Sequence, residues 1–387
     1  MADIQHIYEE LKAAQVPLSE YNPDDQFLHE ANYALSPHQH EGRIVSYGFV
    51  SVSKLKSLQN CTVVKAVEVS IKQARETADG KSIFVIVEDG HYAGLLIFQQ
   101  LRETEYSLVL LQKEVEGILC VADSNGTTRF FSPNGISIHE LRRWRIKPNI
   151  SSTAKIIKGS APMVDYTSLT KVLEFCFYSL SANKIGATIV WFLQEPSDTA
   201  LRAARPQTST QAFHMNLFAS QNLQALPSVL ERNDGAALMS PAGEIVGVGT
   251  HLQVSAKSEE LIPPYAGTRH TSARRFSYDY SESLVFTVSS DGPVSIFSDG
   301  LKVTELYTFD SEAAAEFYRS VVPDPNDVHE SSCEVICPKC GKTSIVHEIL
   351  IYGWRERETA ECPLCGTQLA SRRCFQLNSQ IIKSLGR

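Results

Sequence analysis

Hydrophobic and polar positions in the first part of the chain predict a domain of mixed α and β structure. Residues 44–52 alternate between apolar and polar side chains as a strand does, and residues 62–79 carry an apolar face with helical spacing. Asp89-Gly90 is a turn signal between further apolar runs. These runs predict strands at residues 83–87, 92–98, 106–111 and 117–121.

A second region with the same kind of pattern follows. Residues 169–184 place their apolar side chains on one side of a helix that ends near Gly186. Residues 187–193 are a near-continuous apolar run, as in a buried strand. Two short apolar runs within residues 238–249 predict a hairpin around a turn of small residues. The remaining predicted elements are a hairpin over residues 283–297 and a helix over residues 311–320.

The two regions share part of their order of elements. A helical pattern followed by a strand occurs over residues 62–87 and again over residues 169–193, and residues 119–135 parallel residues 285–300. One hypothesis is that the first domain is a diverged, non-catalytic relative of the second. The alternative, two independent α/β domains with similar hairpins, explains the pattern equally well.

Composition narrows the choice of compartment and partner. The 387 residues are 43% hydrophobic and 21% charged, which is ordinary for a globular protein of two or three domains. The net charge of −8 argues against a general nucleic-acid binder. No apolar run approaches the roughly 20 residues that span a bilayer, and the first residues lack a signal-sequence pattern. We therefore expect a cytoplasmic protein without a membrane partner.

Four cysteines are spaced as metal ligands. Cys337 and Cys340 form one Cys-x-x-Cys pair, Cys362 and Cys365 form a second, and a glycine follows each pair. Two such turns can present four thiolates to one tetrahedral ion, so the spacing predicts a zinc ribbon with structural Zn²⁺. Because this small module has little core, the metal should supply much of its folding free energy. Candidates for additional or substitute ligands are Cys333, Cys374 and His347.

Another group of residues suits a nucleotide and a metal. Residues 234–236 are Asp-Gly-Ala at the start of a predicted strand, and residues 267–270 are Gly-Thr-Arg-His after a proline-containing loop. A carboxylate can bind a metal, glycine lets the backbone approach a ligand, and an Arg-His pair can contact phosphates. Either motif alone is most often a turn or a surface pair. Their joint order, with the helix and strand before them, predicts a nucleotide site.

These two motifs resemble those of the diadenylate cyclase domain, which is shared with the DNA-integrity-scanning proteins. The resemblance covers about residues 169–300, roughly a third of the chain. It implies a metal-dependent nucleotidyltransferase that condenses two ATP molecules into the second messenger cyclic di-AMP, with release of pyrophosphate. It also implies a homo-oligomer, because each domain binds one ATP and two sites must face each other.

The resemblance assigns roles to individual residues. Asp234 would hold Mg²⁺ or Mn²⁺ and help to orient or deprotonate the attacking 3′-hydroxyl. Arg269 and His270 would contact the phosphates, with Arg269 suited to a bidentate grip. The residues expected to bind the nucleotide are Gly235, Ala236, Gly267, Thr268 and Thr271.

Two positions depart from the family pattern. The family continues Arg-His with a second arginine, where this chain has Thr271. It also carries Ser-Glu-Glu in its last hairpin, where this chain has Ser289-Ser290-Asp291. Asp291 is a candidate for the second acid, or a turn residue. These departures would give a slower enzyme, a different nucleotide, or a site that only binds.

The sequence predicts an α/β protein of four parts. They are an N-terminal α/β regulatory or sensor domain at residues 1–150, a cyclase-like domain with a mixed sheet flanked by helices at residues 160–305, a helix and linker at residues 306–330, and a zinc ribbon at residues 331–387. The first functional hypothesis is a diadenylate cyclase acting between two subunits. The second is a catalytically degenerate nucleotide-binding sensor. The third is a nucleic-acid-associated scaffold that uses basic residues of the ribbon, which the acidic net charge disfavours.

Overall fold

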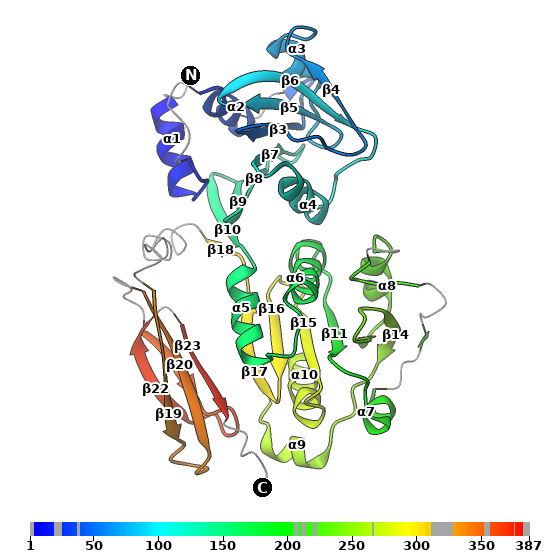
Figure 1. Ribbon diagram of the computed structural model, residues 1–387, viewed down its shortest axis with the longest axis vertical. Helices are drawn as coiled ribbons and strands as arrows, with labels where there is room; N and C mark the ends of the chain where they lie inside the picture. Colours follow the sequence, from blue (N-terminus) through cyan, green and yellow to red (C-terminus); the bar gives the residue numbers. More distant parts are fainter. Residues whose placement is uncertain are drawn as a thin grey trace. The chain divides into compact units, whose positions relative to one another are not determined.

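The chain folds into two compact units. The first comprises Met1–Asn149 and Thr308–Tyr318, and the second comprises Ile150–Tyr307 and Arg319–Arg387 (Figure 1). The structure, a computed structural model, describes residues 4–18, 25–36, 39–204, 208–209, 214–219, 223–264, 267–310, 328–351, 357–374 and 376–381.

The first unit is built on a mixed sheet. Its helices are α1 (Ile4–Ala13), α2 (Gln26–Leu35), α3 (Ile71–Thr77) and α4 (Glu105–Val115). Its strands are β3 (Tyr47–Val52), β4 (Cys61–Lys65), β5 (Ile83–Glu88), β6 (His91–Phe98), β7 (Ile118–Ala122), β8 (Thr128–Ser132), β9 (Gly135–Glu140), β10 (Arg143–Pro148) and β18 (Phe309–Asp310), beside a small hairpin of β1 (Gln39–His40) and β2 (Arg43–Ile44). The strand order is β18-β10-β9-β8-β7-β3-β5-β6-β4. The pair β3–β5 is parallel, and the other neighbours are antiparallel.

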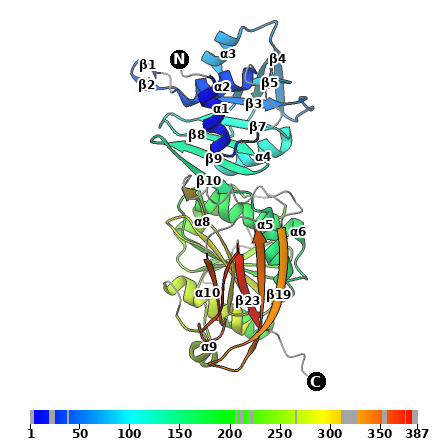
Figure 2. The ribbon, with the colours of Figure 1, turned by 90° about the vertical axis from the view of Figure 1, so that its left-hand side faces the viewer.

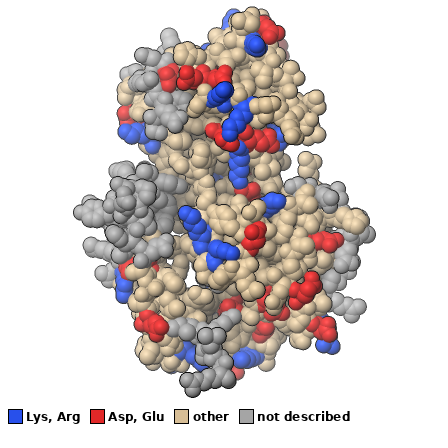
Figure 3. All heavy atoms as spheres, in the orientation of Figure 1, with Lys and Arg blue, Asp and Glu red and all other residues tan. Residues whose placement is uncertain are grey.

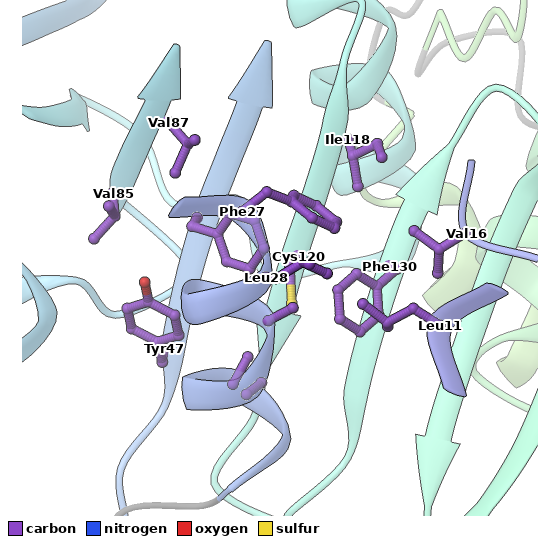
Figure 4. Packing of buried hydrophobic residues seen from close by; sticks show 14 of the residues in the cluster. Leu11, Val16, Phe27, Leu28, Tyr47, Val85, Val87, Ile118, Cys120 and Phe130 are labelled. Atoms are coloured by element: carbon purple, nitrogen blue, oxygen red, sulfur yellow. The ribbon is translucent and has the colours of Figure 1, made fainter. Parts of the chain in front are cut away.

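The core of the first unit lies between its N-terminal helices and one face of the sheet. Phe27 and Leu28 of α2 are fully buried against Cys120 and Phe130 of the central strands (Figure 4). The ring of Phe27 also meets that of Phe49 edge to face, with centroids 5.6 Å apart. Burial of each such side chain contributes about 1.5–3 kcal/mol. Helix packing on this face therefore fixes which side of each strand points inward.

The second unit contains another mixed sheet and a separate cysteine module. Its helices are α5 (Ser151–Ser160), α6 (Tyr166–Glu174), the π-helix η1 (Phe175–Ser181), α7 (Asp198–Ala203), α8 (Leu226–Arg232), α9 (Ala256–Leu261) and α10 (Thr268–Asp279). The strands of the sheet are β11 (Ala187–Phe192), β12 (Thr208–Ser209), β13 (Ala236–Met239), β14 (Ile245–Thr250), β15 (Ser283–Val288), β16 (Val294–Ser298) and β17 (Leu301–Leu306). Their order is β12-β14-β13-β11-β15-β16-β17, with β11 and β13 parallel. The predicted α/β class with a mixed, helix-flanked sheet is confirmed.

Both sheets contain the same seven-strand arrangement. Strands β3 to β9 of the first unit occupy, in chain order, the places that β11 to β17 occupy in the second. The single parallel pair is equivalent as well, β3–β5 in one sheet and β11–β13 in the other. Helices α3 and α4 precede β5 and β7, just as α8 and α10 precede β13 and β15. The topology supports the hypothesis that the two domains are related.

The alignment predicted from the sequence is correct in one half and wrong in the other. The hairpin β7–β8 does correspond to β15–β16. The helix expected over residues 62–79 is instead strand β4 followed by the short helix α3, so the partner of β11 is β3 and not the strand at residues 83–87. Residues 61–65 pair along their length with β6, and Ser70 begins α3 with a capping box.

A second prediction is also wrong. Residues 106–111 lie inside helix α4, not in a strand. Thr104 caps this helix by accepting a hydrogen bond from the N–H of Ser107, whose hydroxyl oxygen accepts one from the N–H of Thr104. The apolar run of residues 108–111 fits a buried helix face as well as a strand, and the cap decides between them.

The cysteine module consists of β structure. Strands β19 (Val328–Ile336), β20 (Thr343–Ile351) and β23 (Gln376–Ile381) form an antiparallel sheet, and Figure 2 shows β19 and β23 from the front. Strands β21 (Arg357–Glu361) and β22 (Gln368–Arg373) form a hairpin. The helix predicted over residues 311–320 lies outside the described residues, as does the linker at residues 323–327.

Two surface properties bear on the expected partners. Among the described residues, no helix has both the length and the apolar character needed to cross a membrane. On the face drawn in Figure 3, basic and acidic side chains lie interspersed. Where this face consists of described residues, it does not show the single-sign basic surface that is typical of a nucleic-acid-binding protein.

Candidate functional site

An open cleft lies in the second unit at the start of β13, the end of β14 and the N-terminus of α10. Its volume is about 810 Å³, which is within the range of small-molecule sites. The two sequence motifs meet here, because residues 234–236 and 267–270 all line the cleft. The hairpin turn between β15 and β16 contributes Ser289, Ser290 and Asp291.

The backbone before β13 requires glycine next to the acid. Gly235 has a φ of +112°, and a Cβ atom there would lie 2.8 Å from the carbonyl carbon of Gly249 and from the carbonyl oxygen of Thr250. A side chain is excluded because β14 comes so close. Asp234, which precedes Gly235, is exposed just before the start of β13 and lines the cleft.

The N-terminus of α10 supplies backbone donors. Its N-cap is Gly267, with a φ of +150°, and the first helical hydrogen bond runs from the Thr271 N–H to the Gly267 oxygen at 2.9 Å. The first N–H groups of an α-helix have no partner within the helix and lie at its positive end. Ala273 and Phe276 bury the next turns in the core. The cleft therefore contains a fixed group of donors suited to phosphate.

The guanidinium of Arg269 lies over the start of β11. A Cβ atom at Gly186 would be only 2.5 Å from Nη1 of Arg269 and 3.6 Å from the Ser290 nitrogen. The absence of a side chain at Gly186 thus makes room for the cation between β11 and the β15–β16 turn. A planar guanidinium held in this place can take two oxygens of one phosphate.

His270 is half-buried and packs on the core. Its ring lies edge to face with Phe297, with centroids 6.1 Å apart. Burial lowers its pKa, and the nearby carboxylates of Glu305 and Asp291 only partly oppose this. The imidazole is consequently neutral at pH 7, where it can donate one hydrogen bond and accept another.

The turn that carries Asp291 is fixed at both ends. Ser289 donates its N–H to Pro293, and Gly292 donates its N–H to Ser289, at 2.9 and 3.0 Å. The hydroxyl of Ser181 in η1 donates to the carbonyl oxygen of Gly292. Asp291 is therefore a turn residue and a cleft residue at once, and its exposed carboxylate is placed on the same cleft as Asp234.

Among the described residues, the predicted nucleotide contact that does not line the cleft is Thr271. Its hydroxyl donates to the Gly267 oxygen at 2.8 Å, so the side chain closes the first turn of α10. Conversely, the sequence motifs omitted several residues that do line the cleft: Thr188, Thr250, His251, Leu252 and Ser272. These residues belong to no motif. The sequence offers one signal for them, which is the hydroxyl of Thr188 inside an otherwise apolar strand.

Four thiols converge in the cysteine module. The Sγ atoms of Cys337, Cys340, Cys362 and Cys365 all lie within 4.8 Å of one another. Two of these separations are 3.4 Å (Cys337–Cys365) and 3.6 Å (Cys340–Cys362), near the roughly 3.8 Å expected of sulfurs tetrahedrally arranged around one zinc. The four residues therefore fit a metal ion.

The other candidate ligands of the module lie elsewhere. Cys374 is fully buried in a small core with Val346 and Leu377, and Cys333 packs against that core. His347 is exposed on β20. None of these three side chains belongs to the group of converging thiols among the described residues.

Comparison with known families agrees with this geometry. Residues 175–301 match the family model described as "DisA bacterial checkpoint controller nucleotide-binding". The chain therefore carries a diadenylate cyclase domain. This family gives the domain a nucleotide-binding or nucleotidyltransferase role, and it confirms the resemblance inferred from the two motifs. Residues 6–148 match a second family model, described as "Probable sensor domain DACNK". No curated protein matches the chain.

Proposed function

We propose that this chain is a diadenylate cyclase that condenses two ATP molecules into cyclic di-AMP and two pyrophosphates. The 3′-oxygen of each ATP forms a bond with the α-phosphorus of the other, its proton leaves, and the bond to pyrophosphate breaks. The observation that carries the proposal is the convergence of Asp234, the N-terminus of α10 and Arg269 on one cleft. An acid near the attacking hydroxyl and cationic groups near the phosphates are the parts that this reaction needs.

The residues of the cleft divide the work between them. Arg269 and the N–H groups of residues 268–270 would bind the phosphates and stabilise the charge that develops on them. Neutral His270 would donate a hydrogen bond to a phosphate oxygen. Asp234 would orient the 3′-hydroxyl and accept its proton. Gly235 and Ala236 would let the nucleotide lie close to β13.

A divalent cation fits the acidic residues of the cleft. Asp234 and Asp291 offer exposed carboxylate oxygens on the same cleft, and oxygen ligands of this kind suit Mg²⁺ or Mn²⁺. When bound, the ion would neutralise phosphate charge and lower the pKa of the attacking hydroxyl. The second acid of the family pattern would then be Asp291.

The reaction requires a homo-oligomer. One cleft provides one set of phosphate-binding residues, whereas the product joins two nucleotides symmetrically. Two subunits would therefore place their clefts face to face, each holding the ATP that the other attacks. The sensor domain would regulate this pairing or the cleft itself.

Incubation of the full chain with ATP and Mn²⁺ or Mg²⁺, with products identified by mass, tests the proposal. Asp234→Asn should lower the rate by roughly a hundredfold or more while ATP still binds. Asp198→Asn, which alters an exposed carboxylate of α7 outside the cleft, should leave the rate unchanged. ATP binding without a cyclic dinucleotide product, under every metal and protein concentration, would instead indicate a nucleotide sensor.

We also propose that the four converging thiolates hold one structural Zn²⁺. A closed site of four cysteines leaves no open position for chemistry. Metal analysis should find one zinc per chain, and Cys340→Ser should lose the zinc and unfold the module. A variant that retains both full metal content and the folded module would show that the thiols act otherwise.

A further inference from the structure

A row of four residues crosses the sheet below the rim of the cleft. Thr287 of β15 pairs with Thr188 of β11, Thr188 pairs with Ala236 of β13, and Ala236 pairs with Thr250 of β14. Residues directly paired across neighbouring strands point to the same face of a sheet. The four side chains therefore form one continuous row, three threonines and one alanine.

The three hydroxyls of this row are buried without a partner. Thr188, Thr250 and Thr287 are 3%, 1% and 0% exposed. Within the part of the chain that the structure describes, none of the three Oγ1 atoms has a hydrogen-bond partner. A buried hydroxyl without a partner is destabilising, and valine would fill the same volume without that cost. Folding alone does not account for threonine at these positions.

Two of the three threonines lie at the cleft. Thr188 and Thr250 line it on either side of Ala236, whereas Thr287 is not among its lining residues. The hydroxyl and methyl groups of threonine are of similar size. Rotation about χ1 can therefore turn either group toward the cleft with little change of packing. Ala236 keeps the floor between the two threonines low.

The first unit shows what the same row contains when the motif residues are missing. The hairpins β7–β8 and β15–β16 have turns of equal length, residues 123–127 and 289–293. Aligning these turns, following the registers and extending the β3–β5 pairing by one residue before Phe49–Val85 gives Val121, Gly48, Phe84 and Leu96 as the equivalent row. Phe84 is fully buried, and a Cβ atom at Gly48 would lie 2.9 Å from its ring. The equivalent row is thus entirely apolar, so the fold does not require threonine at these positions.

The row begins beside the phosphate-binding residues and leads away from them toward β14. Arg269 and the Ser289 turn lie at the β15 and β11 side, and Leu252 lies at the β14 side. Three strand spacings, about 14 Å in all, separate β15 from β14. A nucleotide with its phosphates at α10 would then extend its sugar and base across Thr188, Ala236 and Thr250.

We propose that the hydroxyls of Thr188 and Thr250 hydrogen-bond the nucleoside half of the bound nucleotide, Thr188 the ribose and Thr250 the purine edge. This inference rests on the proposed function, because it takes the cleft as the nucleotide site. A hydroxyl can donate and accept, so it can meet a ribose hydroxyl or a ring nitrogen. The row thereby contributes to specificity for the nucleoside, while Arg269 and the N-terminus of α10 bind the triphosphate of any nucleotide.

Calorimetric binding of ATP and of inorganic triphosphate to the full chain tests the proposal. Thr188→Val and Thr250→Val should each weaken ATP about fivefold to tenfold and leave triphosphate unchanged. Thr287→Val is the matched control, since it removes a hydroxyl of the same row away from the cleft, and it should change neither ligand. Thr188→Ser and Thr250→Ser, which keep the hydroxyl, should retain most of the ATP affinity.

Three results would overturn the proposal. The first is unchanged ATP affinity in both valine variants, which would mean that the hydroxyls bind a buried water molecule or have no partner in the complex. The second is an equal loss for ATP and triphosphate, which would mean general damage to the cleft. The third is a parent chain that binds no ATP. If the parent binds ATP with the predicted pattern but forms no cyclic dinucleotide, the cyclase function fails while the threonine contacts stand.

Discussion

The first unit and the cyclase domain arrange seven strands in the same order, yet only the second keeps a cleft lined by the motif residues. Strand β13 begins after Asp234 and Gly235, whereas Ser82 and Ile83 hold the equivalent places before Phe84. If α4 and α10 are aligned at their N-caps, Tyr106 and Ser107 replace Arg269 and His270. The fold therefore forms without the site, and a few residues at one end of the sheet determine whether a unit has the cleft.

The start of β5 shows how the equivalent space is closed. Asp79 accepts hydrogen bonds from the N–H groups of Lys81, Ser82 and Ile83, each at 2.8 Å. Burial alone would raise the pKa of Asp79, but these bonds lower it below its usual value. The folded loop brings Gly80 against Gly48. A carboxylate thus occurs near this end of both sheets, but in the first unit it binds its own backbone.

The largest effect should follow from replacing Ala236, in the row of threonines, with phenylalanine, the residue at the equivalent position of the first unit. Ala236→Phe inserts a ring where Phe84 stands in the other sheet, and the ring must enter the cleft. We expect ATP affinity to fall by at least about a hundredfold, with an overpacking cost of about 1–3 kcal/mol. Calorimetry and thermal denaturation measure the two effects. Ala236→Ser, which keeps the floor low, should bind as the parent does; normal binding by the phenylalanine variant would place the nucleotide elsewhere.

The reverse change should affect stability and not binding. Phe84→Ala removes a fully buried ring that packs edge to face on Phe98, so the first unit should lose about 3–5 kcal/mol. No second nucleotide should bind, because the motif residues are absent. Denaturation measures the loss of stability, and the number of ATP molecules bound per chain tests for a second site. Val67, which is 91% exposed in the same unit, provides the neutral control Val67→Ala. A second ATP per chain would show that the ring alone closes a working site.

A smaller effect is expected from the glycine below Arg269. Gly186→Ala places a Cβ atom 2.5 Å from Nη1, and the flexible end of the arginine can move aside without unfolding the domain. Displacement of a phosphate-binding group should lower the cyclase rate roughly tenfold to a hundredfold. In the first unit, the residue equivalent to Gly186 is Ser46, and the residue equivalent to Arg269 is Tyr106.

Gly159→Ala is the matched control for this change, since a Cβ atom there meets nothing within 4 Å. Gly159→Ala, which lies in helix α5, should unfold at or slightly above the parent's temperature because alanine favours a helix, and only Gly186→Ala should lose activity. Equal activity in the two variants would show that the position of Arg269 over β11 does not matter for the reaction.

The sequence indicated which residues line one cleft better than it predicted the sheet around that cleft. Asp234 and Arg269 could be found because their chemistry is uncommon in such an order, and the four cysteines because a knuckle needs a fixed local spacing. Helix α4 was mistaken for a strand because its apolar run suits both, although Thr104 marked its start. Strand β4 was missed because residues 61–65 look like the first turn of a helix until β6 pairs with them.

The threonine row could not be seen from the sequence at all. Thr188, Thr250 and Thr287 are far apart along the chain and become neighbours only through the pairing of three different strands. Register depends on which face of each strand the core buries, and that is a property of the whole sheet. For the same reason the repeat was recognised at its hairpin, where the turn is local, and misaligned at its first strand.

The smallest expected effect concerns pH. Burial lowers the pKa of His270 below its usual 6.5, so below that pH the unfolded chain takes up a proton that the folded domain resists. The cyclase domain should therefore be more stable above pH 6.5 and lose a little stability as the pH falls to 5.5. His270→Gln should flatten this part of the dependence, as measured by urea midpoints. The first unit, with Ser107 at the equivalent position, should not respond to the change. An unaltered pH slope in the variant would mean that the imidazole is protonated equally easily in the folded and unfolded chain.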